Sequence, residues 1–210
     1  CTKITCGDSA MLSNGPLSGL KVVDLSRVLA GPFCSMNLGD MGANVIKVER
    51  PDGGDDTRRF GPPFINDVST YYLAINRNKR SIALDLKSKA GKDVLWSLLS
   101  DADVLLENFR PGTLDRLGFD FPKCQKHNPK LIYCSISAFG HAGVPEWSLR
   151  PGYDLILQGM GGIPSITGAP NGPPSKVGAS IADVVAGMNA FTGILLAIIA
   201  RHSTGLGQKV

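Results

Sequence analysis

Histidine is scarce in this sequence, and the cysteines do not occur in pairs. The 210 residues include three histidines and five cysteines, with no CxxC spacing. Zinc sites and disulfide frameworks need paired or clustered ligands, so we predict neither and expect a reducing compartment. The five cysteines are Cys1, Cys6, Cys34, Cys124 and Cys134.

A signal-peptide hydrophobic segment is also lacking near the first residue, which is Cys1 and not Met. We therefore expect the native N-terminus to lie upstream of this residue. Residues 1–15 are polar and unpatterned, which predicts a loose tail. A cleaved organelle-targeting segment is compatible with such a start.

Charge is scarce in the last 80 residues. Residues 1–130 contain 18 of the 22 basic and 15 of the 18 acidic side chains, which leaves four and three for the remainder. The contrast predicts a charged, surface-rich first part and an apolar, glycine-rich second part. Because the pattern of elements changes after residue 150, we predict a domain over 16–150 and a separate segment over 151–210. The net charge of +4 suits a small anionic ligand better than a nucleic acid, which needs a denser basic face.

The glycine fingerprint of dinucleotide-binding proteins is absent. Residues 26–32 (SRVLAGP) contain one glycine where the fingerprint needs three, which argues against NAD. Apolar runs nevertheless alternate with segments of helical spacing, and this order predicts a doubly wound, Rossmann-like α/β fold with a parallel sheet. The predicted strands are 20–25, 44–49, 81–86, 103–107 and 131–136; the predicted helices are 30–41, 90–99 and 111–117; and 51–63 is a predicted loop.

Two further helices are predicted after residue 150, over 152–162 and from Ile181 to Ser203. The uncharged stretch 184–200 of the second is at the short limit for a membrane span, and it contains glycine and polar residues. A helix buried in a core or an interface, with no membrane partner, is therefore the favoured interpretation. The final two residues have the composition of a new strand, so we expect a C-terminally truncated chain.

Basic side chains follow or precede several predicted strands. In a doubly wound sheet, ligands bind at the carboxyl ends of the strands, where such cations would hold an anion. The alternative is a solvated charged surface, and for the group as a whole the two interpretations are balanced. The residues are Arg27, Arg50, Arg58, Arg59, Arg77, Lys79, Arg80, Lys87, Arg110 and Arg116.

Asp183 lies at the start of the long apolar helix. Ser180 and Asp183 have the spacing of a capping box, which on pattern alone is the favoured interpretation. The functional alternative is a carboxylate nucleophile at a glycine-rich pocket, kept ionised by the helix N-terminus. Tyr153 and Asp154 are likewise either catalytic or capping. No Ser-His-Asp set is evident, because none of the three histidines has a convincing nucleophile nearby in the sequence.

Eight segments, taken in order, resemble the class III CoA-transferases, the family of formyl-CoA transferase and carnitine CoA-transferase. The resemblance runs from about residue 16 to the last residue. A finer resemblance, to the mitochondrial succinate–hydroxymethylglutarate CoA-transferases, rests on 28–32 (VLAGP), 37–40 (NLGD) and 69–73 (STYYL). The eight segments are 17–26 (LSGLKVVDLS), 30–32 (AGP), 38–50 (LGDMGANVIKVER), 54–58 (GDDTR), 78–82 (NKRSI), 103–112 (DVLLENFRPG), 150–154 (RPGYD) and 204–208 (TGLGQ).

The resemblance implies a chemistry and a set of site residues. Asp183 aligns with the family's nucleophilic aspartate, which reverses the preference for a cap. It implies a ping-pong transfer of CoA between acids, with coenzyme A as substrate and no tightly bound cofactor or metal. The positions that would contact CoA are Arg27, Val28, Arg50, Leu84, Lys87, Asn108, Phe109 and Arg116, with Arg50, Lys87 and Arg116 facing phosphates and Leu84 and Phe109 lining the adenine site.

Departures from the family pattern bear on the substrate. A glutamine of formyl-CoA transferase falls on Leu29 and a tryptophan on Phe60, so formate and oxalate are disfavoured. The substrate pocket is expected to include Leu29, Phe60, Tyr153 and Asp154, and to take a larger acid such as glutarate or hydroxymethylglutarate, with succinyl-CoA as donor. Related racemases have a histidine base at the position of Tyr153. Because this chain has no histidine there, we rank a racemase second to a transferase.

The family is roughly twice this long and forms interlocked homodimers. A chain that ends at Val210 lacks the small domain, so an inactive CoA-binding fragment is a third possibility. By the finer resemblance we expect a mitochondrial protein, and otherwise a cytoplasmic one. No nucleic-acid or membrane partner is expected.

Overall fold

A five-stranded parallel sheet forms the centre of the computed structural model, which describes residues 15–210. Cys1, Cys6 and nearly all of the predicted tail lie outside the described residues. The strand order is β5-β2-β1-β6-β7, so the chain moves outward from β1 first to one edge and then to the other. The strands are β1 (Lys21–Asp24), β2 (Asn44–Glu49), β5 (Lys79–Ala83), β6 (Val104–Glu107) and β7 (Ile132–Ser135).

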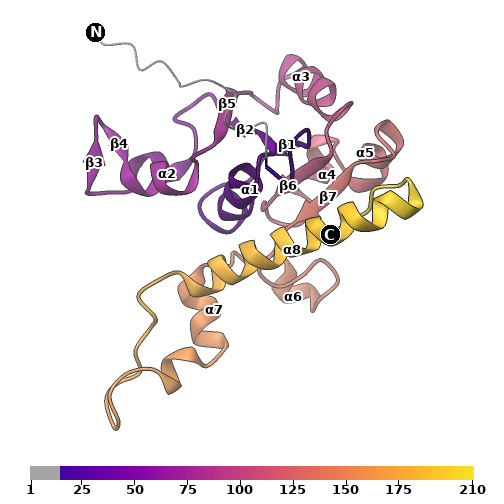
Figure 1. The fold of residues 1–210 in the computed structure, drawn as a ribbon. Helices are drawn as coiled ribbons and strands as arrows, with labels where there is room; N and C mark the ends of the chain where they lie inside the picture. Colours follow the sequence, from indigo (N-terminus) through magenta and orange to yellow (C-terminus); the bar gives the residue numbers. More distant parts are fainter. Residues whose placement is uncertain (1–14) are drawn as a thin grey trace.

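Helices cover both faces of this sheet, which confirms the predicted doubly wound α/β fold (Figure 1). Successive residues of a strand point to opposite faces, so Val22 packs under α1 and α8 while Val23 packs under α3, α4 and α5. The crossover helices are α1 (Ala30–Asp40), α3 (Lys89–Leu99), α4 (Thr113–Leu117) and α5 (Phe121–His127). Between β2 and β5 lie η2 (Asp56–Arg59), β3 (Phe64–Ile65), β4 (Val68–Ser69) and α2 (Thr70–Ile75).

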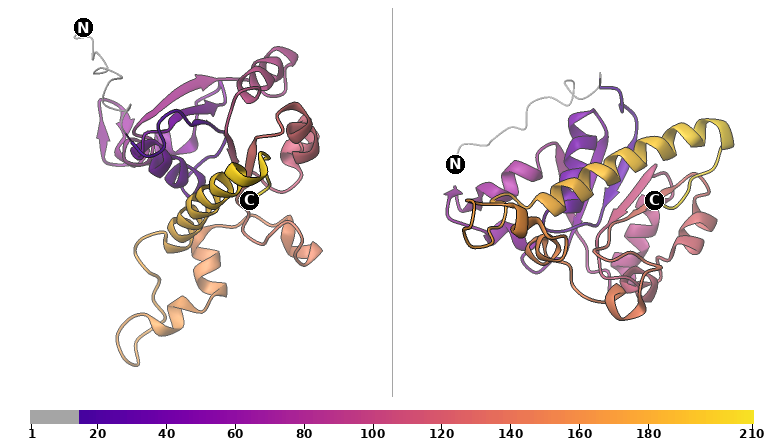
Figure 2. Two further views of the ribbon diagram at one scale, coloured as in Figure 1. Left: turned by 45° about the vertical axis from the view of Figure 1, so that its right-hand side comes forward. Right: turned by 90° about the horizontal axis from the view of Figure 1, so that it is seen from below.

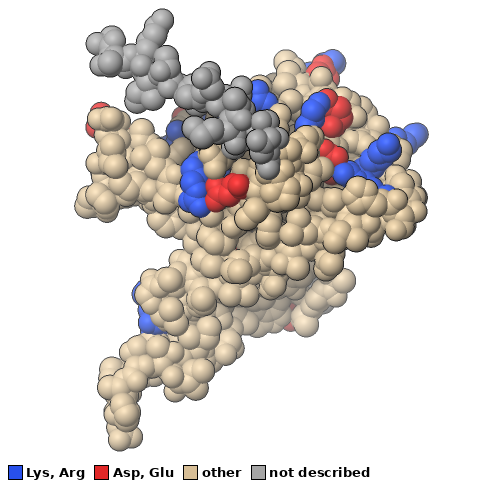
Figure 3. Space-filling model, viewed as in Figure 1, with Lys and Arg blue, Asp and Glu red and all other residues tan. Residues whose placement is uncertain are grey.

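After β7 the chain builds a lobe that projects from the sheet domain (Figures 1 and 2). Figure 3 shows few charged side chains on this lobe, in agreement with the sequence pattern, while those of the first part gather over the sheet domain. The chain then returns as a long helix, and its last residues run parallel to β7, where the amide of Val210 donates to the carbonyl of Tyr133. The elements are α6 (Pro145–Ser148), α7 (Asp154–Met160), η3 (Ile163–Ile166) and α8 (Ile181–Thr204).

Helix α8 packs on α1 through small residues. A Cβ atom at Gly187 would lie 2.5 Å from the carbonyl oxygen of Ala30, so only glycine permits this approach. The packing brings the first turn of α8, with Asp183, to the first turn of α1. The opposite side of α8 is exposed and apolar, at Val185, Met188, Leu196 and Ile199, so within this chain the helix is buried on one side only. By length and composition alone it is also apolar enough to cross a membrane.

Several predicted boundaries are wrong. β5 begins at Lys79 and not at Ser81, because its pairing with β2 starts at Val45. α4 begins after Gly112, whose φ of 77° stops the helix from including Pro111. The predicted loop 51–63 contains the 3-10 turn η2. The other predicted strands and helices are present, with ends that differ by a few residues.

Candidate functional site

The carboxyl ends of β1 and β6 lie side by side, and the chain leaves them toward opposite faces of the sheet. Such a switch point is where doubly wound sheets bind ligands. Two hydrogen bonds join the loops that begin there. The amide of Arg27 donates to Oδ1 of Asn108 at 2.8 Å, and Nδ2 of Asn108 donates to the carbonyl of Arg27 at 2.7 Å. The two loops therefore form one wall.

A cavity of about 320 Å³ lies against this wall, between the ends of β1, β2 and β5 and helix α4. The Arg27 guanidinium lies over the Phe109 ring, 5.0 Å from its centroid. Cations at the rim and apolar side chains on the floor suit a phosphate-bearing ligand with an apolar ring. Six of the eight residues expected to contact CoA line this cavity: Arg27, Arg50, Leu84, Lys87, Phe109 and Arg116.

The other two expected contacts lie beside this cavity. Asn108 lines the neighbouring cavity that contains Asp183. Val28 is 37% exposed and has a φ of 67°, a left-handed conformation that is strained for a β-branched residue. Its amide donates to Oδ1 of Asp55 at 3.3 Å. The strained turn is therefore held by a carboxylate from the loop after β2.

A buried ion pair supports the same turn from below. Nζ of Lys47 lies 2.9 Å from Oδ2 of Asp55 and donates to the carbonyl of Ser26 at 2.9 Å. Lys47 is 1% exposed and Asp55 is 1% exposed. Sequence reasoning missed this pair. Its only sequence signal is a lysine in the middle of an otherwise apolar strand, NVIKVE.

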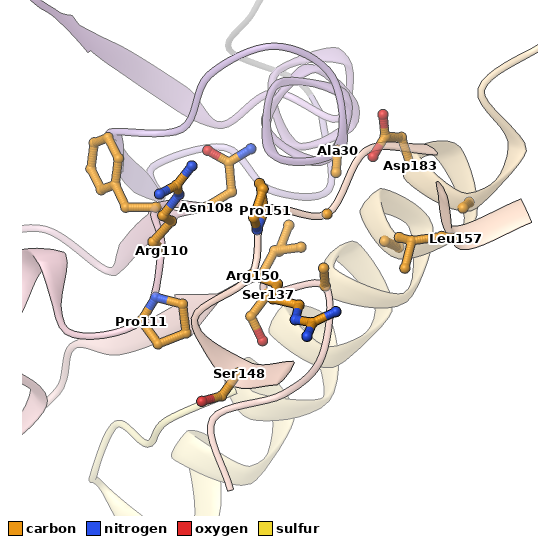
Figure 4. Close-up of a pocket in the computed structure, with 16 residues that line it drawn as sticks. Ala30, Asn108, Arg110, Pro111, Ser137, Ser148, Arg150, Pro151, Leu157 and Asp183 are labelled. Carbon is orange, nitrogen blue, oxygen red and sulfur yellow. The ribbon is translucent and has the colours of Figure 1, made fainter. Parts of the chain in front are cut away.

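A second cavity, of about 200 Å³, contains Asp183 (Figure 4). Figure 4 shows Asp183 beside Ala30 at one side and Arg110 with Pro111 at the other. Phe109 lines this cavity and the first one, so the two adjoin. A ligand in the cationic cavity can therefore extend toward Asp183.

Burial, and next the negative charge of Asp154, raise the pKa of Asp183 to about 6. The position at the helix N-terminus therefore does not lower this pKa below its ordinary value, although the expected ionised form still predominates at neutral pH. Arg110 and Arg150 line the same cavity but neither forms an ion pair with Asp183 within the described residues. At neutral pH the group is mostly ionised and remains a stronger base than an ordinary aspartate.

The predicted capping box is absent, because Ser180 makes no side-chain cap hydrogen bond. Asp154 caps α8 from another helix instead. Its Oδ1 accepts from the amides of Ala182 at 2.8 Å and Asp183 at 3.4 Å. Of the two possibilities left open for Asp154, catalysis or capping, the geometry supports a cap, but of α8 and not of its own helix.

None of the four residues of the expected substrate pocket, Leu29, Phe60, Tyr153 and Asp154, lines the cavity that contains Asp183. Leu29 is buried in the turn before α1, and Tyr153 is 68% exposed. Phe60 packs edge to face on Tyr71, with ring centroids 5.7 Å apart. Tyr71 itself was not predicted. Burial, and next the charge of Asp183, raise its pKa to about 12, which places it near the carboxylate. Tyr71 lies within segment 69–73, which carries the finer family resemblance, and that segment is the sequence signal that could have identified it.

One histidine does have a nucleophile nearby, contrary to expectation. Nε2 of His141 lies 2.8 Å from Oγ of Ser135, which also contacts the carboxylate of Glu107. The acid therefore contacts the serine and not the histidine, so the order of a catalytic triad is not met. Within residues 15–210, no group of three or more His, Cys, Asp or Glu side chains is placed to hold a metal ion.

Some of the predicted anion-binding cations are used by the protein itself. Arg58 forms an ion pair with Glu49 at 2.6 Å, Arg77 one with Asp40 at 2.6 Å, and Lys79 lies 3.6 Å from buried Asp24. Burial would raise the pKa of Glu49, but the hydrogen bonds from Arg58 and Ser81 lower it to about 2. The Arg58–Glu49 pair therefore braces the loop after β2 beside the cavity, whereas Arg77 joins the end of α1 to the segment before β5, at the opposite edge of the sheet.

A doubly wound parallel sheet with a cationic cavity at its switch point, and a half-buried carboxylate in the adjoining cavity, defines a class of anion-binding α/β proteins. Comparison with known proteins identifies the class further. The model of CoA-transferase family III matches residues 17–210. The chain therefore belongs to CoA-transferase family III.

Known relatives agree with this assignment. Succinyl-CoA:glutarate CoA-transferase of Mus musculus is 46% identical over 192 residues, which cover 91% of this chain and 44% of that protein. Acetyl-CoA:oxalate CoA-transferase of Acetobacter aceti is 47% identical over 197 residues, 93% of this chain and 50% of that protein. The crystal structure of a CAIB/BAIF family protein from Brucella suis superposes with a TM-score of 0.90 at 47% identity, over 94% of this chain and 52% of that one. The chain spans about half the length of these relatives.

Proposed function

We propose that this chain carries the CoA-binding site and the nucleophile of a CoA-transferase that moves coenzyme A from an acyl-CoA to a carboxylic acid. The observation that carries the proposal is the placement of Asp183 in a cavity that shares Phe109 with the cationic cavity. The rim cations would hold the phosphates of CoA, and the shared wall would direct its thioester to the carboxylate.

In the proposed reaction, a carboxylate oxygen of Asp183 attacks the thioester carbon. The C–S bond breaks, which leaves a mixed anhydride on Asp183 and a CoA thiolate. The thiolate then attacks the carbonyl carbon of Asp183, expels the donor acid as a carboxylate and forms an aspartyl-CoA thioester. The acceptor carboxylate repeats the two steps in reverse, which yields the new acyl-CoA and free Asp183. Each step exchanges one acyl bond for another, so no redox partner is needed.

The finer proposal is a dicarboxylic acid as acceptor, with succinyl-CoA as donor. Its support is the pair Arg110 and Arg150, which line the cavity of Asp183 and could hold a second carboxylate. The glutarate and oxalate relatives both act on dicarboxylates by name. Oxalate is therefore again a candidate acceptor acid, although Leu29 and Phe60 had disfavoured it. We also propose that the full-length protein is a mitochondrial homodimer. The exposed apolar side of α8 supports this part of the proposal, because such a surface is suited to packing against another protein surface.

Trapping the acyl intermediates tests the proposal. Incubation with succinyl-CoA, acetyl-CoA or glutaryl-CoA, followed by hydroxylamine and peptide mass mapping, is expected to give a hydroxamate on Asp183. The acyl-CoAs that yield it define the donor class. A folded, CoA-binding sample that gives no adduct would leave a binding fragment, and exchange of the α-proton without an adduct would point to a racemase.

The cationic cavity is tested by binding. The double variant Lys87→Ala/Arg116→Ala is expected to raise the Kd for CoA by about 30–160-fold, because two phosphate contacts of roughly 1–1.5 kcal/mol each are lost. Isothermal titration calorimetry measures the change, and the difference from wild type should shrink as salt is raised. Lys89→Ala removes a cation of α3 that pairs with Asp93 and is the matched control. Equal Kd values for the double variant and the control would contradict the assignment.

A further inference from the structure

Helix α7 holds the segment that carries Asp183 at two points. Gln158, which is 1% exposed, accepts at Oε1 from the amide of Val177 at 2.9 Å. Its Nε2 donates to Oδ2 of Asp154 at 2.6 Å and to the carbonyl of Ala179 at 3.3 Å. A single side chain of the lobe, that of Gln158, therefore holds residues 177–179 in place by hydrogen bonds.

Asp154, one turn earlier on α7, fixes the other end of that segment. Its Oδ1 accepts from the amides of Ala182 and Asp183. The first amides of a helix have no partner within the helix, and Ser180 supplies none from its side chain. Both oxygens of Asp154 are thereby engaged, one by α8 and one by Gln158.

We propose that Asp154 and Gln158 are a positioning pair, which orients the carboxylate of Asp183 by clamping residues 177–183. The inference rests on the proposed function for the reaction that it serves. Neither residue needs to touch substrate for this role, since each acts through the backbone that carries Asp183.

The charge of Asp154 has a chemical consequence of its own. It lies on the nucleophile side of the cavity and opposes ionisation of Asp183, so the attacking oxygen stays more basic and more nucleophilic. The other ionisable groups around Asp183 are Arg110 in the loop after β6 and Arg150 before α7, which line the same cavity, and Tyr71 on α2, whose pKa is raised in part by the charge of Asp183. Of all these groups, Asp154 is the one whose charge raises the pKa of Asp183.

Three variants separate the two roles. Asp154→Asn keeps Oδ1 for the amides of Ala182 and Asp183, removes the charge and gives up the contact with Gln158. The acid limb of the kcat/KM profile should therefore move below pH 6, although burial keeps it above that of an ordinary aspartate. Gln158→Met keeps the charge and removes the clamp on 177–179, so kcat should fall with the acid limb unmoved. Asp154→Ala loses both and is expected to lower kcat on the order of 10²-fold, with the Kd for CoA unchanged.

An NMR titration of Asp183 provides a readout that does not depend on turnover. In protein labelled with carboxyl-13C aspartate, the Asp183 signal is expected to titrate at lower pH in Asp154→Asn than in wild type or in the surface control Asp93→Asn. A wild type without acyl transfer would overturn the proposed function alone, since the titration still decides the pair. Unchanged titration in Asp154→Asn, or an unchanged rate in both Asp154→Asn and Gln158→Met when both are folded by circular dichroism, would overturn the pair.

Discussion

Replacement of Asp183 by asparagine is expected to reduce acyl exchange on the order of 10⁴-fold or more, the scale seen when a covalent nucleophile is removed. An amide oxygen is a far weaker nucleophile than a carboxylate and cannot form the anhydride and thioester that carry the reaction. Exchange of labelled glutarate or succinate into the acyl-CoA pool measures the loss. Asp183→Ala is tested as a second variant, because asparagine can revert slowly to aspartate by deamidation and alanine cannot.

The same variant should leave CoA binding intact. Among the described residues, Asp183 does not line the cationic cavity. The Kd for CoA should therefore change by less than about twofold, a few tenths of a kcal/mol. Asp101→Asn, at an exposed position paired with Lys21, is the matched control for loss of one carboxylate. Full activity in Asp183→Asn would remove Asp183 from the mechanism, whereas loss of CoA binding would mean that the variant disturbs the fold.

The reaction should also depend on pH through this group. The pKa of Asp183 is raised from the ordinary value to about 6, so the nucleophilic carboxylate is progressively protonated as the pH falls through 6. We therefore expect kcat/KM to rise with pH up to a plateau near neutrality. For stability the sign is opposite: a raised carboxyl pKa favours the folded state at low pH, and that contribution is lost between the ordinary pKa and about 6.

Replacement of Lys47 by methionine is expected to lower the free energy of unfolding by about 3–5 kcal/mol, the usual cost of leaving one partner of a buried ion pair alone. The variant leaves Asp55 charged and buried, and it removes the donor to the carbonyl of Ser26. Urea denaturation followed by far-UV circular dichroism measures the loss. CoA binding should weaken as well, because the turn with Arg27 and Val28 loses its support from below.

Two companion variants make this prediction specific. Lys21→Met removes a lysine from the neighbouring strand β1, where the pair with Asp101 is exposed, and should cost less than about 1 kcal/mol. Lys47→Met combined with Asp55→Asn should recover part of the loss, since the asparagine keeps an oxygen for the amides of Val28 and Thr57 without the buried charge. A cost for Lys47→Met no larger than that of Lys21→Met would show that the buried pair does not hold the turn.

The sequence by itself determined the sheet and three of its four crossover helices, but not α5, and it predicted the chemical type of the site. Strands such as β2 and β6 are short apolar runs bounded by turns, so local composition is enough to find them. Most of the residues expected to bind CoA gather at one cavity because parallel strands place their following loops at the same edge. The family segments added Asp183, which its local pattern alone assigned to a cap.

Only the tertiary structure decided how these residues are held. Lys47 pairs with a carboxylate 8 residues away, Asp154 accepts from amides 28 and 29 residues away, and Gln158 contacts backbone groups 19 and 21 residues away. No local pattern specifies such contacts. The raised pKa of Asp183 depends on burial, which arises when α8 packs on α1, and on the charge of Asp154, which arises when α7 meets α8. A sequence encodes local propensity residue by residue, whereas burial and electrostatic fields come from all the atoms that packing brings near, so they exist only in the folded chain.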